Sequence, residues 1–116
     1  MVTMLGKFLR FYRLNHNQLL KDMADKLELT SAYLSSIENG KRKPTEEFIK
    51  NVKETYNLSE QEHDDLMDAY FQTIQSITID TSDAKQEQAD LGLIFARKIK
   101  SLDEDDIAQI KKILNK

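Results

Sequence analysis

The fold is decided by residues 23–44, which read MADKLELTSAYLSSIENGKRKP. The apolar side chains in this stretch are Met23, Ala24, Leu27, Leu29, Leu34 and Ile37. Their spacing is typical of two short helices joined by a tight turn, and we expect helices over 18–27 and 31–38. Asn39 and Gly40 tolerate the left-handed backbone that ends a helix. A loop with three basic residues then precedes a proline.

A helix-turn-helix unit explains where the small and large residues stand. The first helix must offer a small residue where the second helix crosses it, and Ala24 is small. Leu29 would seal the corner after the turn, while Leu34 and Ile37 would anchor the second helix and leave its outer face free. That face carries Thr30, Ser31, Ala32, Tyr33, Ser35 and Ser36. Short polar side chains and one aromatic can reach base edges and phosphates in a major groove.

The two halves of the chain differ in charge. The whole sequence carries 17 basic and 20 acidic residues, a net charge of −3. Residues 1–56 have 10 basic and 7 acidic side chains, whereas residues 57–116 have 7 basic and 13 acidic ones. A basic surface attracts nucleic acid because neutralised phosphates release condensed counterions. We therefore expect nucleic acid to bind the N-terminal half.

The stretch over 23–44 resembles the phage-repressor-like (Xre, Cro/CI-type) helix-turn-helix family. It carries counterparts of the family's leucine-alanine opening, here Met-Ala, of its serine-isoleucine-glutamate helix ending, and of its glycine-lysine-arginine-x-proline loop. The resemblance covers roughly residues 4–60, and the remaining half looks like a tail found in some bacterial members.

The resemblance implies a lambda-repressor-like domain of five helices, whose third helix enters the major groove of double-stranded DNA. The residues implied to face bases are Ser31, Ala32, Tyr33 and Ser36. Those implied to touch the DNA backbone are Asn39, Lys41 and Arg42. Tyr33 has an alternative role, packing over the neighbouring helix, because an aromatic ring with one polar tip suits either.

Two positions depart from the family pattern. Leu20 stands where the family often has a glutamine that clamps a phosphate or base, so Gln18 or Lys21 would take that role. Glu28 stands where the turn usually has a glycine, so it must adopt a left-handed conformation or sit in a remodelled turn. The full set of expected DNA-binding residues is Gln18, Lys21, Thr30, Ser31, Ala32, Tyr33, Ser35, Ser36, Asn39, Lys41, Arg42 and Lys43.

The rest of the first 75 residues also predicts helices, because glycine and proline are rare and apolar residues recur at helical intervals. A helix over 3–15 has an apolar stripe, with Lys7, Arg10 and Arg13 on the other side. The stripe consists of Leu5, Phe8, Leu9, Phe11 and Tyr12. Thr45 is the expected N-cap of a fourth helix, and Ser59 with Glu62 has the capping-box spacing for a fifth. The sequence thus predicts a mainly α fold with a DNA-binding domain over residues 1–75.

Residues 76–116 predict a strand followed by a helical hairpin. Residues 76–80 alternate polar and β-branched side chains, which favours a strand. A sixth helix follows, and Ser101 with Glu104 has the spacing of a capping box for a seventh. An unpaired strand exposes backbone donors and acceptors, so we expect this tail to form a homodimer interface. The expected interface residues are Ile77, Ile79, Leu91, Ile94, Phe95, Ile107, Ile110 and Leu114. The alternative is that the hairpin covers the strand within one chain.

Composition gives no support to an enzyme, a cofactor or a metal site. The chain has no cysteine, and its two histidines, His16 and His63, are read as surface residues in different elements. Neither a GxGxxG nor a GxxxxGK(S/T) string occurs. No apolar run approaches the ~18 residues of a membrane span, and no secretory signal is evident, so we expect a cytoplasmic protein.

The function that these patterns favour is a sequence-specific DNA-binding transcriptional regulator, most simply a repressor. One recognition helix reads few base pairs, so we expect a homodimer on a pseudo-palindromic operator. The alternative is an antitoxin or adaptor whose acidic C-terminal half binds a partner protein.

Overall fold

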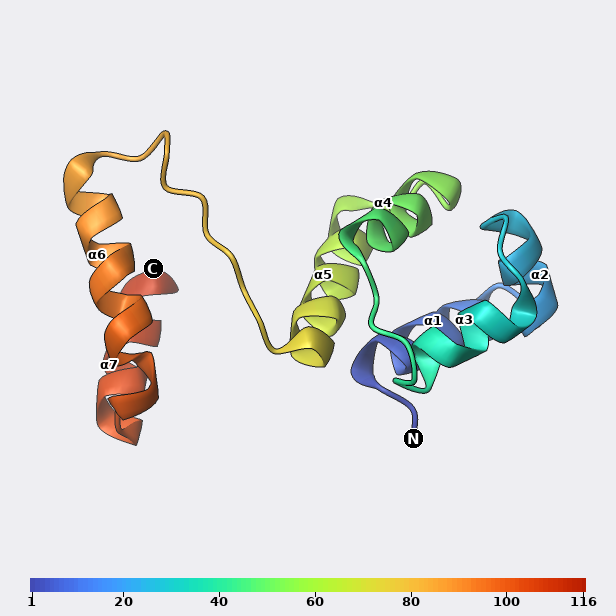
Figure 1. The fold of residues 1–116 in the computed structure, drawn as a ribbon, viewed down its shortest axis with the longest axis horizontal. Helices are drawn as coiled ribbons and strands as arrows, with labels where there is room; N and C mark the ends of the chain where they lie inside the picture. The colour runs from blue at the N-terminus through green and yellow to red at the C-terminus, as the bar shows by residue number, and fades with distance from the viewer. The chain divides into compact units, whose positions relative to one another are not determined.

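The computed structural model describes all 116 residues and is mainly helical, as predicted (Figure 1). In chain order the elements are α1 (Met4–Asn15), α2 (Leu20–Lys26), α3 (Ser31–Glu38), α4 (Glu46–Thr55), α5 (Glu60–Ile74), α6 (Gln86–Lys98), the 3-10 helix η1 (Ile99–Ser101) and α7 (Glu104–Leu114). The chain divides into two compact units, Met1–Ile77 and Thr78–Lys116.

The strand predicted over 76–80 is wrong. The structure contains no β-strand, and these residues have no regular secondary structure. Ile77 and Ile79 are 66% and 71% exposed. A strand is stable only when a neighbour pairs with its backbone N–H and C=O groups. The chain offers no such neighbour here, so the alternating pattern alone does not produce a strand.

Most helices begin at a residue whose side chain accepts a backbone hydrogen bond. Thr45 Oγ1 accepts from the N–H of Phe48 at 3.0 Å, and Ser59 forms the predicted capping box with Glu62. The box predicted for Ser101 and Glu104 is wrong, because Asp103 and Asp106 form it instead. The Ser101 hydroxyl donates to the carbonyl of Lys98 at 2.8 Å and ends the preceding turn.

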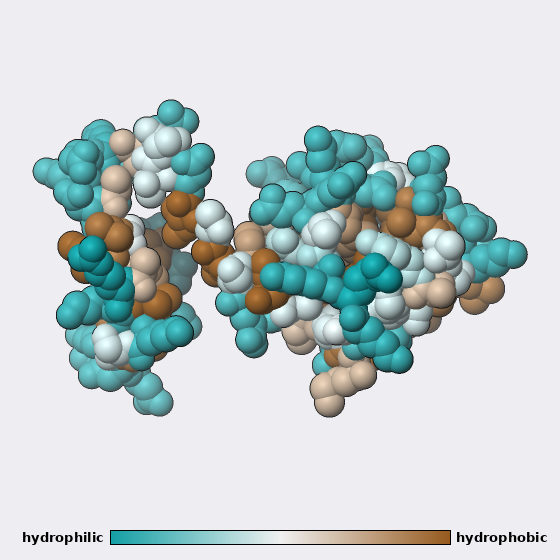
Figure 2. All heavy atoms as spheres, viewed as in Figure 1, coloured by the Kyte–Doolittle hydropathy of each residue, from teal (hydrophilic) through white to brown (hydrophobic).

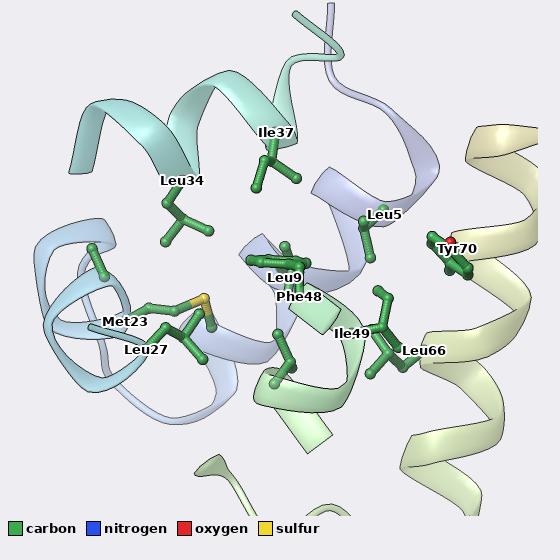
Figure 3. Close-up of a cluster of buried hydrophobic side chains, with 12 residues drawn as sticks. Leu5, Leu9, Met23, Leu27, Leu34, Ile37, Phe48, Ile49, Leu66 and Tyr70 are labelled. Carbon is green, nitrogen blue, oxygen red and sulfur yellow. The ribbon is translucent and has the colours of Figure 1, made fainter. Parts of the chain in front are cut away.

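The core of the first unit surrounds α1, which packs against α2, α3 and α5 (Figure 3). The buried cluster consists of Leu5, Leu9, Met23, Ala24, Leu27, Leu34, Ile37, Phe48, Ile49, Val52, Leu66 and Tyr70. Phe8 and Tyr12 flank this cluster as half-buried residues. The prediction that Phe11 belongs to the same apolar stripe is wrong, because its side chain is 65% exposed. It follows Leu9 by two positions, about 200° around the helix, and so lies on the opposite face.

Three backbone features fix the positions of α2 and α3. Glu28 adopts the left-handed conformation, with φ of 60°, so the turn keeps its tight geometry without a glycine. The N–H of Leu29 donates to the carbonyl of Ala24 at 2.8 Å and closes the corner. At the other end of α3, a Cβ built on Gly6 would lie 2.2 Å from the carbonyl oxygen of Glu38, so α1 and α3 are in close backbone contact.

The second unit consists of α6, η1 and α7, and none of its three helices contains a fully buried residue. Hydrophobic side chains lie on its surface (Figure 2). The large exposed ones are Leu91, Leu93, Ile94, Phe95, Ile99, Ile107, Ile113 and Leu114. A unit of this size without a core depends on covering these side chains for its stability.

None of the helices combines the length and the hydrophobicity that crossing a membrane requires.

Candidate nucleic-acid interface

Helix α3 presents one face to the core and the other to solvent. Leu34 and Ile37 are buried and point toward α1 and α4 (Figure 3). Thr30 caps the helix, since its Oγ1 accepts from the N–H of Tyr33 at 3.0 Å. On the outer side Ala32 is exposed, while Ser31, Ser35 and Ser36 are half-buried. Ala32, Ser35 and Ser36 therefore lie on the side of the helix that faces away from Leu34 and Ile37.

Helix α2 supports α3 through a small buried residue. Ala24 is fully buried, and α2 and α3 pack against each other. At the start of α2, Gln18 Oε1 accepts from the hydroxyl of Tyr56 at 2.9 Å. Burial raises the pKa of the Tyr56 hydroxyl above its ordinary value, so it remains a donor. Gln18 is thus joined to the end of α4, while Lys21 is exposed.

A buried ion pair fixes the C-terminal end of α3 to α1. The Glu38 side chain is 1% exposed and accepts hydrogen bonds from both Nη atoms of Arg13, one of them at 3.1 Å. Arg10 Nε adds a contact to Glu38 Oε1 at 3.3 Å. The prediction that Arg13 lies on the polar side of its helix is wrong, because the side chain is buried. Sequence reasoning missed the pair, although Arg13 continues the four-residue spacing of Leu5 and Leu9 that faces the core.

Several polar groups on α3 are engaged within the protein. The Ser36 hydroxyl donates to the carbonyl of Tyr33 at 2.6 Å. Asn39 Nδ2 donates to the Ser35 carbonyl at 2.9 Å and lies 3.2 Å from the Ser35 hydroxyl. Arg10 Nη2 donates to Asn39 Oδ1 at 3.4 Å. These bonds shape the end of the helix and leave Ser35, Ser36 and Asn39 fewer hydrogen-bonding sites for a ligand.

The basic loop folds back onto the end of α3. Gly40 has a φ of 74°, and the N–H groups of Lys41 and Arg42 donate to the carbonyl of Ser36 at 2.9 and 3.1 Å. The side chains of Lys41, Arg42 and Lys43 are exposed, and none forms an ion pair. The loop that follows α3 therefore carries three positive charges without an ion-pair partner.

Arg42 stacks on Tyr33. The guanidinium carbon lies 4.6 Å from the centroid of the Tyr33 ring. Tyr33 is half-buried and packs against the hydrophobic core. Tyr33 thus packs against the core in the free protein, and its role toward DNA stays a prediction.

The histidines differ in exposure. His16 is exposed and stacks on Tyr12 with ring centroids 4.2 Å apart. His63 is half-buried and lines a groove of about 630 Å³ between α4 and α5, where its Nδ1 has no hydrogen-bond partner. No group of three or more His, Cys, Asp or Glu side chains is arranged to hold a metal ion.

The predicted dimerisation residues lie outside the helix-turn-helix region. Ile77 and Ile79 belong to the irregular segment after α5. Leu91, Ile94 and Phe95 lie on α6, and Ile107, Ile110 and Leu114 lie on α7.

Comparison with known proteins identifies a family. A family model described as a helix-turn-helix domain matches residues 6–70, more than half of the chain and all of the region from α2 to α4. No curated protein and no solved structure matches.

Proposed function

Because the chain belongs to the helix-turn-helix domain family of DNA-binding proteins, we propose that it is a sequence-specific regulator of transcription that inserts α3 into the major groove of double-stranded DNA. The observation that carries this proposal is the combination at α3. A helix anchored by Leu34, Ile37 and Glu38 leaves one face free, and the loop that follows it carries three unpaired cations. Within this family we propose that it is one of the Xre, Cro/CI-type repressors, whose motif the sequence over 23–44 resembles.

The contacts divide by chemistry. Thr30, Ser31, Ala32, Ser35 and Ser36 form the surface toward the bases. Lys21, Lys41 and Lys43 hold phosphates, since a lysine ammonium is a flexible point charge that needs no fixed geometry. Gln18 and Asn39 support the two ends of the unit by their hydrogen bonds to Tyr56 and Arg10.

The phosphate contacts are tested by substitution in the full-length chain. Lys41→Ala combined with Lys43→Ala should weaken binding to every duplex alike and flatten the salt dependence by about one unit per lost contact. Lys100→Ala, an exposed cation of the second unit, is the matched control and should change neither quantity. Equal salt slopes for the double variant and the parent would contradict this assignment.

We further propose that the protein acts as a homodimeric repressor and that its second unit forms the dimer interface. Support comes from the exposed apolar side chains of α6 and α7, which have no cover within their own unit. Each helix is also acidic at its start and basic at its end, so antiparallel pairing of two copies opposes unlike charges. Two copies double the number of base pairs read on a pseudo-palindromic operator.

The dimer is tested by sedimentation. A chain ending at Gln75 should be a folded monomer with much lower operator affinity, and the full-length Leu91→Asp variant should behave alike. A truncated chain that still dimerises would remove the tail from this role. The alternative, an antitoxin or adaptor, is favoured if purification from the native host yields a stoichiometric protein partner.

A further inference from the structure

The outer face of α3 has few free hydrogen-bonding groups of its own. Ser36 and Ser35 are hydrogen-bonded within the protein, and Ala32 has only a methyl group. Arg42 adds five N–H donors to this face, because its side chain lies across Tyr33, the third residue of the helix. The richest set of donors beside α3 therefore belongs to the loop and not to the helix.

Tyr33 holds the guanidinium in a defined place. Its ring is fixed between the core on one side and Arg42 on the other. The Arg42 backbone is fixed as well, since its N–H donates to the Ser36 carbonyl at 3.1 Å. The stacking and the backbone hydrogen bond favour this position of the side chain before DNA binds, so binding loses less conformational freedom.

We propose that Arg42 is a specificity-determining residue that reads a guanine in the major groove, and that Tyr33 is the positioning residue that aims it. The inference rests on the proposed function, because it requires α3 to enter the groove. A planar guanidinium donates to guanine O6 and N7 together, whereas an ammonium does not reproduce this fork. No carboxylate competes for Arg42 in the free protein.

The assignment differs from what the family resemblance implies, which gives Arg42 to the DNA backbone and Tyr33 to a base. A phosphate contact would be lost equally on every sequence. A guanine contact is lost only where that guanine is present, so base preference separates the two roles.

The experiment uses the full-length chain and a duplex chosen by selection from a random library. Affinity is measured on this duplex and on all of its single-base variants. The proteins compared are the parent, three single variants and one double variant. The single variants are Arg42→Lys, Tyr33→Phe and Tyr33→Leu, and the double variant combines Arg42→Lys with Tyr33→Leu. We expect Arg42→Lys to lower the preference for one guanine about tenfold or more, a bidentate contact's usual contribution. Tyr33→Leu should relax the same position, Tyr33→Phe should keep it because the ring remains, and the double variant should lose no more than Arg42→Lys alone.

Other outcomes overturn the inference. Uniform weakening with a flatter salt slope in Arg42→Lys would make Arg42 a phosphate contact. Relaxation at a different base in Tyr33→Leu, or additive losses in the double variant, would show that Tyr33 acts independently. Circular dichroism checks folding, and Arg42→Lys and Tyr33→Phe, as surface and isosteric changes, keep the test available if Tyr33→Leu unfolds. A parent chain that selects no sequence would refute the proposed function together with this inference.

Discussion

Replacing Glu38 by glutamine removes the carboxylate that faces Arg13 and Arg10 while nearly preserving the size of the side chain. Glu38 is 1% exposed and the Arg13 side chain 10%, so the substitution leaves a buried guanidinium without its counterion. Breaking a buried pair in this way costs about 3–5 kcal/mol of unfolding free energy. For a domain of this size, that corresponds to a fall in Tm of roughly 12 °C or more.

The matched control is Glu54→Gln. The Lys50–Glu54 pair has an N···O distance of 4.0 Å, and its side chains are 75% and 65% exposed. An exposed pair of this kind contributes at most about 0.5 kcal/mol. Urea unfolding followed by circular dichroism compares the two variants with the parent. Equal midpoints for Glu38→Gln and Glu54→Gln would refute the reasoning that the buried pair anchors α3.

Gly6→Ala should destabilise the protein, although a helical alanine ordinarily gains about 0.5–1 kcal/mol over glycine, because the new Cβ would lie 2.2 Å from the Glu38 carbonyl oxygen. A Tm above that of the parent would contradict the close contact between Gly6 and the Glu38 carbonyl. Ala24→Leu should cost ~1–3 kcal/mol by overpacking the α2–α3 contact and should weaken DNA binding, measured by calorimetry and fluorescence anisotropy. Parental melting and binding would show that the two helices do not depend on a small residue there. The N–H of Ser59 donates to the Glu62 carboxylate and lowers its pKa, so this stabilisation is present near neutral pH and is lost as the pH falls through the lowered pKa. Glu62→Gln should therefore lower the Tm near pH 7 and have little effect on it near pH 3. A Tm difference between parent and variant that is the same at both pH values would contradict this role of the Glu62 carboxylate.

The helices could be predicted from the sequence because their determinants are local. Thr45 and Ser59 predict the starts of two helices, and each caps its helix through a residue three positions later. Both caps are present in the structure. The helix-turn-helix pattern left two possibilities for Glu28, a left-handed conformation or a remodelled turn, and the structure has the first. Local spacing was sufficient for the existence of the helices but not for every cap, since Asp103 and Asp106 form the box that the spacing of Ser101 and Glu104 predicts.

The contacts between distant residues could not be predicted in the same way. Glu38 and Arg13 are 25 positions apart, and burying a charge runs against the rule that charged side chains face solvent. The stacking of Arg42 on Tyr33 depends on the path of the loop after Gly40. The strand over 76–80 failed for the opposite reason, because its pattern was local but its stability needed a pairing partner.

Selection of bound duplexes from a random library by the full-length protein tests the central claim most directly. We predict an enriched motif of two inverted half-sites whose centres lie about 10 base pairs, or a multiple of that, apart, as a twofold dimer with one recognition helix in each half-site requires. Bound duplexes with no enriched motif would contradict the claim that this protein reads DNA sequence.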